Sequence, residues 1–234
     1  MSGWVWVSAD QWLRQRELLG EGQKVLEGAS ALVVGCGGLG AGAIPALVAS
    51  GVGRVVLMDD DVLDLTNLNR QTLYTTDDLG AEKVERATAR MAALSPSTRV
   101  EGLHRRLSAD DADFVQDFDV VLDCTDMMAS RAAISASCRS AGVPWVWAAV
   151  DGWRGVLSVF VPGGVQWEDV VGDASELGRR PQVLGATPAM LGAWQAAEAI
   201  KLLSGQGHPV SGRLAVVDLL AGTVREVPLS ARRS

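Results

Sequence analysis

The chain has 234 residues, of which 48% are hydrophobic and 21% charged, so it can bury a sizeable core and wholesale disorder is excluded. A formal net charge of -7 excludes broad, charge-driven binding of nucleic acid, which needs a basic surface. The three cysteines, Cys36, Cys124 and Cys138, include no Cys-x-x-Cys pair, so neither a disulfide framework nor a cysteine-rich zinc site is expected.

The start of the chain, Met1–Trp6, lacks a basic region followed by a long apolar core, which a signal peptide would show. No apolar run approaches the 18 residues that a membrane-spanning helix needs. We therefore expect a cytoplasmic protein with no membrane partner.

Alternating apolar and helical segments dominate the first two thirds of the chain. An N-terminal helical arm is predicted over 1–28, with one or two helices at 9–27, followed by a core over 29–160. Strands alternating with helices predict an α/β fold with a Rossmann-like, doubly wound, mainly parallel sheet. The predicted strands are 30–35, 54–58, 98–103, 119–123, 144–149 and 155–161, and the predicted helices are 38–50, 81–94, 109–116 and 128–141.

The periodic pattern ends after Pro162-Gly163-Gly164. The following residues predict an irregular crossover segment over 161–187, of the kind that is functional or mobile. A helix at 188–204 and a hairpin of strands 213–218 and 223–228 then predict a C-terminal antiparallel extension over 188–234. All of 1–234 is expected to form one domain.

A glycine-rich turn, Gly35-Cys36-Gly37-Gly38-Leu39-Gly40, connects the first predicted strand to the helix after it. Gly35, Gly37, Gly38 and Gly40 let backbone amides approach a phosphate closely. Asp59 follows Gly40 by 19 residues, at the end of the next predicted strand, which suits hydrogen bonds to ribose hydroxyls. This motif alone favours a dinucleotide, NAD or FAD.

Three further features favour a nucleoside triphosphate over a dinucleotide. The motif doubles its glycine at Gly37–Gly38, and the polar residues Asn67, Arg70 and Lys83 follow Asp59 within 25 residues. Asp123–Asp126 lies at the end of a neighbouring strand, at the edge of the sheet where ligands of open α/β folds bind. Cations and a metal serve a triphosphate, whereas a nicotinamide needs neither, so an NAD-dependent oxidoreductase is the less favoured alternative.

In their order and spacing these segments resemble the HesA/MoeB/ThiF family of ubiquitin-activating-enzyme-like adenylyltransferases. The resemblance is strongest to the branch that activates sulfur-carrier proteins, and it runs from about Gln11 to Val227. It implies that 1–234 is a single adenylation domain. The matching segments are Arg14-Gln15, Gly35–Gly40, Gly51–Gly53, Asp59 with Asp61, Asn67–Gln71, Gly80–Val84, Asp123–Asp126 and Ala196–Leu203.

The resemblance implies ATP and Mg²⁺ as cofactors. The glycine turn would cradle phosphate, Asp59 would bind the ribose hydroxyls with Asp61 beside it, and Asn67 would contact the triphosphate.

Four residues carry catalytic roles by the same resemblance. Arg70 and Lys83 would hold the triphosphate, and Asp126 would bind Mg²⁺. Arg14 would reach the nucleotide site of the other subunit, which implies a homodimer. Taken alone, Lys83 also fits an ordinary surface lysine and Arg14 a solvated helix charge.

The implied reaction activates the C-terminal glycine carboxylate of a small ubiquitin-like sulfur carrier ending in Gly-Gly. The carboxylate attacks ATP, forms an acyl-adenylate and releases pyrophosphate. One alternative is ATP-dependent activation of a tRNA base or a peptide, although the acidic balance weighs against tRNA. Another is a nucleotide- or partner-binding module without turnover.

The chain departs from the family pattern at four points, one of which is Gln11-Trp12 in place of the family's Arg-Tyr. Many relatives bind zinc through two Cys-x-x-Cys pairs, which are absent here, so we expect no zinc. Residues 162–181 contain no cysteine that could accept the activated carboxylate, so the reaction is expected to stop at the acyl-adenylate. Met127 stands where the family commonly has asparagine.

Overall fold

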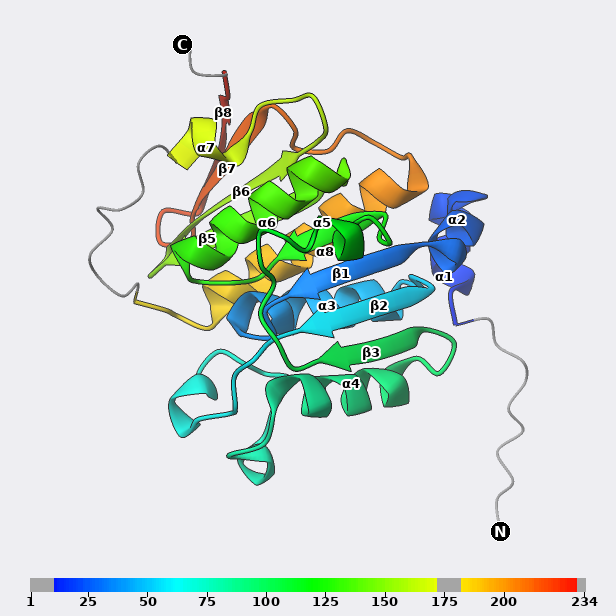
Figure 1. Cartoon of the computed structure of the whole chain (residues 1–234), viewed down its shortest axis with the longest axis vertical. Coiled ribbons are helices and arrows are strands. Elements are labelled where there is room, and N and C mark those ends of the chain that lie inside the picture. Colours follow the sequence, from blue (N-terminus) through cyan, green and yellow to red (C-terminus); the bar gives the residue numbers. More distant parts are fainter. Residues whose placement is uncertain (1–10, 172–181, 231–234) are drawn as a thin grey trace.

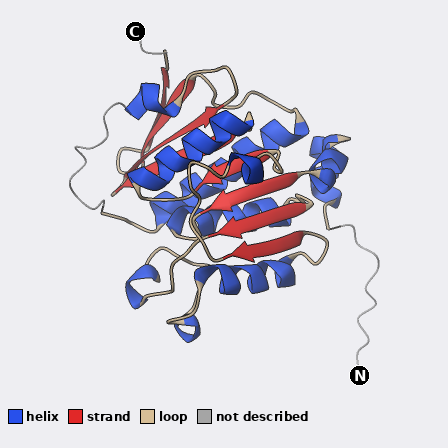
Figure 2. Ribbon diagram, in the orientation of Figure 1, coloured by secondary structure: helices blue, strands red, loops and turns tan. Residues whose placement is uncertain are grey.

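One mixed sheet organises the chain, and the computed structural model describes residues 11–171 and 182–230 of it. Its eight strands lie in the order β3-β2-β1-β4-β5-β6-β7-β8; Figure 1 labels them, and Figure 2 draws the same strands in red. Their bounds are β1 Ser30–Val34, β2 Arg54–Met58, β3 Arg99–Leu103, β4 Val120–Asp123, β5 Trp145–Asp151, β6 Arg154–Phe160, β7 Arg213–Asp218 and β8 Thr223–Pro228.

The sheet has a parallel half and an antiparallel half. Strands β3, β2, β1, β4 and β5 pair in parallel. Strands β6, β7 and β8 continue the sheet in antiparallel fashion. The predicted doubly wound sheet with a C-terminal antiparallel extension is therefore confirmed.

The chain changes direction across the sheet between β1 and β4. It builds outward from β1 through β2 to β3, and then returns to place β4 on the other side of β1. Open α/β sheets bind ligands in the crevice at the carboxyl ends of the strands that flank such a switch. Val34 of β1 lies level with Met58 of β2 and Asp123 of β4, so the segments that follow these three strands meet at one edge.

Helices cover both faces of the sheet. Side chains of α3, α4 and α8 share one buried cluster with Ala31 and Val33 of β1. Side chains of α5, α6 and α7 share the other with Leu32 and Val34 of the same strand, and α6 and α8 lie on opposite faces in Figure 1. The helices are α1 Leu13–Leu19, α2 Gly22–Gly28, α3 Gly38–Ala49, α4 Lys83–Leu94, α5 Ala112–Val115, α6 Met128–Ala141, α7 Trp167–Val171 and α8 Ala186–Ser204, with short 3-10 turns at η1 Leu65–Asn67 and η2 Thr76–Asp78.

The predicted crossover segment at 161–187 is only partly irregular. The short helix α7 lies within it, so that prediction was wrong for 167–171. Five residues are too few to show helical periodicity, and this helix is held by the buried indole of Trp167, whose ring centroid lies 6.4 Å from that of Trp147. Residues 172–181 of the segment, and residues 9–10 of the first predicted helix, lie outside the described part.

Helix α8 begins at Ala186, two residues before the predicted start at Pro188. Pro188 is the third residue of the helix, and a proline is tolerated in a first turn because its missing N–H has no intrahelical partner there. The start of the helix lies close to the loop that contains Asn69, since a Cβ at the preceding Gly185 would overlap the carbonyl oxygen of Asn69.

Helices α3 and α8 pack with their backbones in close approach. A Cβ atom at Gly192 of α8 would overlap the carbonyl oxygen of Leu39, and one at Gly42 of α3 would overlap that of Ala189. Since α3 begins at the glycine turn, this contact also sets where the turn lies.

We predict that Gly192→Ala lowers the free energy of unfolding by about 2–3 kcal/mol, because the new methyl group must push two packed helices apart. Denaturant unfolding followed by circular dichroism measures the change. The control is Gly28→Ala at the end of α2, where a Cβ meets no atom within 4 Å, so the expected change is within about 0.5 kcal/mol. A Gly192→Ala protein as stable as this control would contradict the packing described.

Candidate nucleotide site

The glycine turn sits where the ends of β1 and β4 come together. Gly35 has a φ of 100°, and a Cβ there would lie 2.6 Å from the carbonyl oxygen of Cys124. Only glycine meets both demands without strain. Gly37 then caps the 12-residue helix α3, which begins at Gly38. Its free N–H groups and the positive end of its dipole make this point favourable for an anion.

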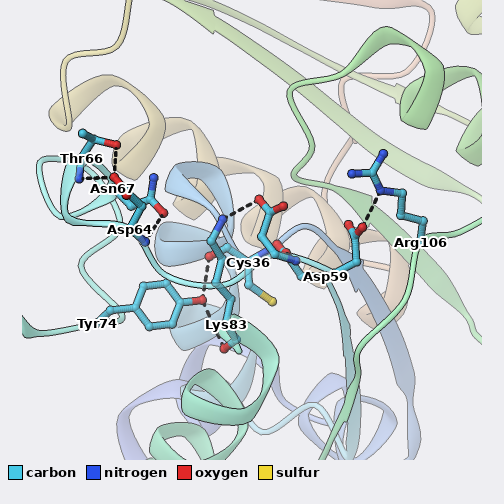
Figure 3. A network of polar contacts seen from close by, with 10 residues as sticks. Cys36, Asp59, Asp64, Thr66, Asn67, Tyr74, Lys83 and Arg106 are labelled. Carbon is cyan, nitrogen blue, oxygen red and sulfur yellow. Dashed lines mark hydrogen bonds and ion pairs between the residues drawn. The ribbon is translucent and has the colours of Figure 1, made fainter. Parts of the chain in front are cut away.

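Asp59 braces the turn from the end of β2 (Figure 3). Its carboxylate accepts hydrogen bonds from the backbone N–H of Cys36 at 2.7 Å and of Asp61 at 2.8 Å. Burial raises the pKa of Asp59, and these N–H groups and the nearby Lys83 oppose that rise. The Tyr74 hydroxyl donates to the carbonyl of Cys36 at 2.9 Å, so the turn is held from two sides.

Lys83 is a buried amine at the first residue of α4. Lys83 is 4% exposed, and its Nζ lies 2.7 Å from Oδ2 of the exposed Asp61. The alternative of an ordinary surface lysine is therefore wrong. A buried ammonium needs a counter-charge, and the Asp61 carboxylate supplies it.

Arg70 borders the start of α3. Its Cγ lies 3.4 Å from where a Cβ of Gly38 would be, and its Nη1 donates to the carbonyl of Thr66 at 3.1 Å and to Oδ1 of Asn69 at 2.9 Å. The loop that carries it begins in η1, where Asn67 accepts a hydrogen bond from the backbone N–H of Asp64. Asn67 thus shapes the loop that presents Arg70.

Asp126 follows the end of β4 and is exposed. Its carboxylate makes no hydrogen bond or ion pair with residues of 11–171 or 182–230, so it is available as an oxygen ligand. Asp123, three residues earlier, is fully buried, and burial raises the pKa of its carboxyl to about 6. The two acids therefore have different roles: Asp126 faces solvent, and the buried Asp123 supports the turn between them.

Arg14 lies away from this group. It is exposed on α1, and its neighbour Gln15 donates to the carbonyl of Ser50 at 2.7 Å, just beyond the C-terminal end of α3. The glycine turn is at the opposite end of α3, about 18 Å away for a helix of this length. The chain therefore brings Arg70, Lys83 and Asp126 to the edge of the glycine turn but does not bring Arg14 there.

Several residues near the glycine turn and the end of β4 were not predicted from the sequence. Gln71 is 4% exposed, and its Nε2 lies 3.6 Å from where a Cβ of Gly37 would be. Tyr74 holds the glycine turn through the carbonyl of Cys36. Arg131 and Gln195 hold the end of β4 and the turn after it through the carbonyls of Thr125 and Asp123. Only Gln71 carried a signal, since it closes the Asn67–Gln71 segment; the others are recognised by contacts between distant parts of the chain.

Within the described residues we looked for groups that could hold a metal ion and for helices that could cross a membrane. The acids that could together hold an ion there are Asp59, Asp60 and Asp61, but Asp59 is hydrogen-bonded, Asp60 pairs with Arg106 and Asp61 with Lys83. Cys36, Cys124 and Cys138 are buried. None of the helices in 11–171 and 182–230 combines the length and the apolar character needed to cross a membrane.

Known proteins are similar along nearly the whole chain. The SAMP-activating enzyme E1 of Haloferax volcanii (strain DS2) is 38% identical over 214 residues, covering 89% of this chain and 79% of that protein. The sulfur carrier protein ThiS adenylyltransferase of Escherichia coli (strain K12) is 38% identical over 205 residues, covering 85% and 81%. The molybdopterin-synthase adenylyltransferase of the same organism is 34% identical over 215 residues, covering 89% and 86%.

A solved structure and a family model are also similar to this chain. The fold matches that of E. coli MccB crystallised with ATP, with a TM-score of 0.86 at 21% identity over 97% of this chain and 73% of that one. The model of the ThiF family matches residues 12–234. The chain therefore belongs to the ThiF family.

Proposed function

We propose that this protein is an ATP-dependent adenylyltransferase that activates the C-terminal glycine carboxylate of a small ubiquitin-like sulfur carrier ending in Gly-Gly. Family membership supports the reaction class, since two of the relatives named above are adenylyltransferases, one of them of the sulfur carrier protein ThiS, and the third is a SAMP-activating enzyme E1. The observation that carries the proposal is the meeting of the glycine turn, Arg70, Lys83 and Asp126 at one edge of the sheet.

The reaction depends on neutralising the charge of the phosphoryl oxygens more than on proton transfer. A terminal carboxyl has a pKa of about 3.5 and is ionised at neutral pH, so it attacks the α-phosphorus of ATP without a general base. The bond from that phosphorus to the bridging oxygen breaks, pyrophosphate leaves, and the acyl-adenylate remains. In-line positioning and neutralisation of phosphoryl charge therefore govern the rate.

The residues at the glycine turn fit this demand. The N–H groups at the start of α3 would bind a phosphate, and Arg70, whose Cγ borders Gly38, would neutralise charge there with its guanidinium. Lys83 is held with its amine at Asp61, and nucleotide phosphate would compete with that carboxylate for it. Asp59 and Asp61 would lie at the ribose, with Asn67 holding the loop of Arg70.

Asp126 fits Mg²⁺, which prefers one or two carboxylates together with phosphate oxygens and water. The ion when bound would neutralise charge on the triphosphate. Three dispersed, buried cysteines give this chain no donor set for structural zinc, and we include none.

The distance of Arg14 from its own glycine turn supports a homodimer in which Arg14 reaches the site of the other subunit. The whole chain would then act as one adenylation domain in each subunit.

We predict that Arg70→Ala lowers carrier-dependent pyrophosphate–ATP exchange by about 100-fold or more, because a positioned cation at the transferring phosphoryl group is lost. The matched control is Arg86→Ala on α4, where Arg86 is 44% exposed and lies 3.8 Å from Asp78. Exchange by this control should stay within about twofold, since surface ion pairs contribute little. Full exchange by Arg70→Ala, or exchange that does not depend on any carrier, would refute the proposal.

Mixing two inactive variants tests the role of Arg14. If Arg14 acts on the other subunit, a 1:1 mixture of Arg14→Ala and Arg70→Ala refolded or co-expressed together regains about a quarter of wild-type exchange, because each mixed dimer holds one complete site. Each variant alone should stay inactive. A mixture as inactive as its components would show that Arg14 acts within its own subunit, and full exchange by Arg14→Ala alone would show that it acts in no site.

A further inference from the structure

The end of β4 is held from both faces of the sheet. On the α8 side, the amide of Gln195 is fully buried and donates to the carbonyl of Asp123 at 2.7 Å and to that of Val146 at 3.1 Å. The Cys124 thiol lies 3.5 Å from the Oε1 of the same side chain. These contacts leave the backbone of Asp123 and Cys124 little freedom to move.

Asp123 shapes the turn that follows. Its Oδ1 accepts hydrogen bonds from the backbone N–H of Thr125 at 2.9 Å and from the Thr125 hydroxyl at 2.7 Å. Its Oδ2 is buried and has no hydrogen-bond partner in the described part of the chain. A buried carboxylate in this position requires a counter-charge close by.

Arg131 supplies that charge from the first turn of α6, on the opposite face from Gln195. Its Nε lies 3.9 Å from Oδ2 of Asp123, with side chains 10% and 0% exposed. Its Nη2 donates to the carbonyl of Thr125 at 2.9 Å. The guanidinium also lies over the ring of Trp147, 6.0 Å from its centroid, which limits the directions in which it can point.

The carbonyl of Thr125 is the last backbone group before Asp126. Arg131 therefore touches the chain one peptide away from the residue that presents the exposed carboxylate, yet its own guanidinium is buried behind the turn. It is poorly placed to act as a surface ligand of nucleotide, since its side chain is 10% exposed and its guanidinium is engaged by Asp123, the Thr125 carbonyl and the Trp147 ring.

We propose that Arg131 is a positioning residue of the adenylation site, which fixes the Asp123–Thr125 turn and thereby the direction of the Asp126 carboxylate. The inference rests on the metal role proposed for Asp126 above. Arg131 is then a buried group that affects Mg²⁺ binding only through Asp126, so its effect on Mg²⁺ binding should disappear when Asp126 is replaced.

The test is a double-mutant cycle on equilibrium binding of α,β-methylene-ATP, an analogue that cannot release pyrophosphate. Isothermal titration calorimetry at several Mg²⁺ concentrations yields the Mg²⁺-dependent part of the affinity for wild type, Arg131→Lys, Asp126→Ala and the double variant. We expect Arg131→Lys to weaken that part about tenfold, as loss of a group orienting a metal ligand does. In the Asp126→Ala background, Arg131→Lys should weaken it by less than about twofold, because coupled residues are not additive.

A matched control lies on the same helix. Arg139→Lys changes a residue whose Nη1 lies 3.6 Å from Glu168 and whose side chain is 54% exposed, so it should leave Mg²⁺-dependent binding unchanged. If Arg131→Lys does not fold, Arg131→Met combined with Asp123→Asn removes both buried charges together, and the same coupling to Asp126→Ala is expected.

Additive losses, or an Arg131→Lys protein that binds like wild type, would overturn the positioning role alone. An Asp126→Ala protein with unchanged Mg²⁺ dependence would overturn the metal role of Asp126, and the role of Arg131 with it. Thermal unfolding of each variant separates both outcomes from a loss of folded protein.

Discussion

The close approach of two strand ends is the constraint on which the rest of the structure depends. Gly35 and Cys124 follow β1 and β4, and the space between them leaves no room for a side chain at Gly35. This contact places the start of α3 at the point where the sheet changes its direction of winding. Apart from Arg14, the groups proposed to act on ATP are positioned relative to that turn.

Polar groups at the turn fall into a supporting set and an exposed set. Asp59, Asp123, Arg131 and Gln195 make their hydrogen bonds to backbone and hold the turns in place. Asp61 and Asp126 are exposed at the same edge, and Arg70 is half-buried there. Buried polar groups of this kind cost free energy unless they are satisfied. Here most of their partners are backbone atoms that shape the site, and the remaining buried oxygen, Oδ2 of Asp123, faces the Arg131 guanidinium. The exposed set can then stay in place before a nucleotide arrives, which lowers the cost of binding.

Sequence patterns predicted the sheet well because its strands are continuous apolar runs between helices. The glycine turn, Asp59 and the Asp123–Asp126 segment were also predictable, since each directly follows a strand and parallel strands end at one edge. Helix α7 was not, because five residues show no period and Trp167 is fixed by tertiary packing. Gln195 and Asp123 are 72 residues apart in sequence, and their hydrogen bond has no local signal. The burial of Lys83 likewise depends on the loop packed over α4, which no helical pattern reveals.

Mass spectrometry of the carrier protein is the most direct measure of the central claim, that this edge of the sheet adenylates a C-terminal carboxylate. A sulfur carrier ending in Gly-Gly is incubated with the protein, ATP and Mg²⁺, with pyrophosphatase present to draw the reaction forward. The expected product is the carrier bearing AMP on its terminal glycine, formed by Arg70→Ala at least about 100-fold more slowly than by wild type. A protein that binds ATP at the glycine turn but leaves every such carrier without AMP would contradict the claim.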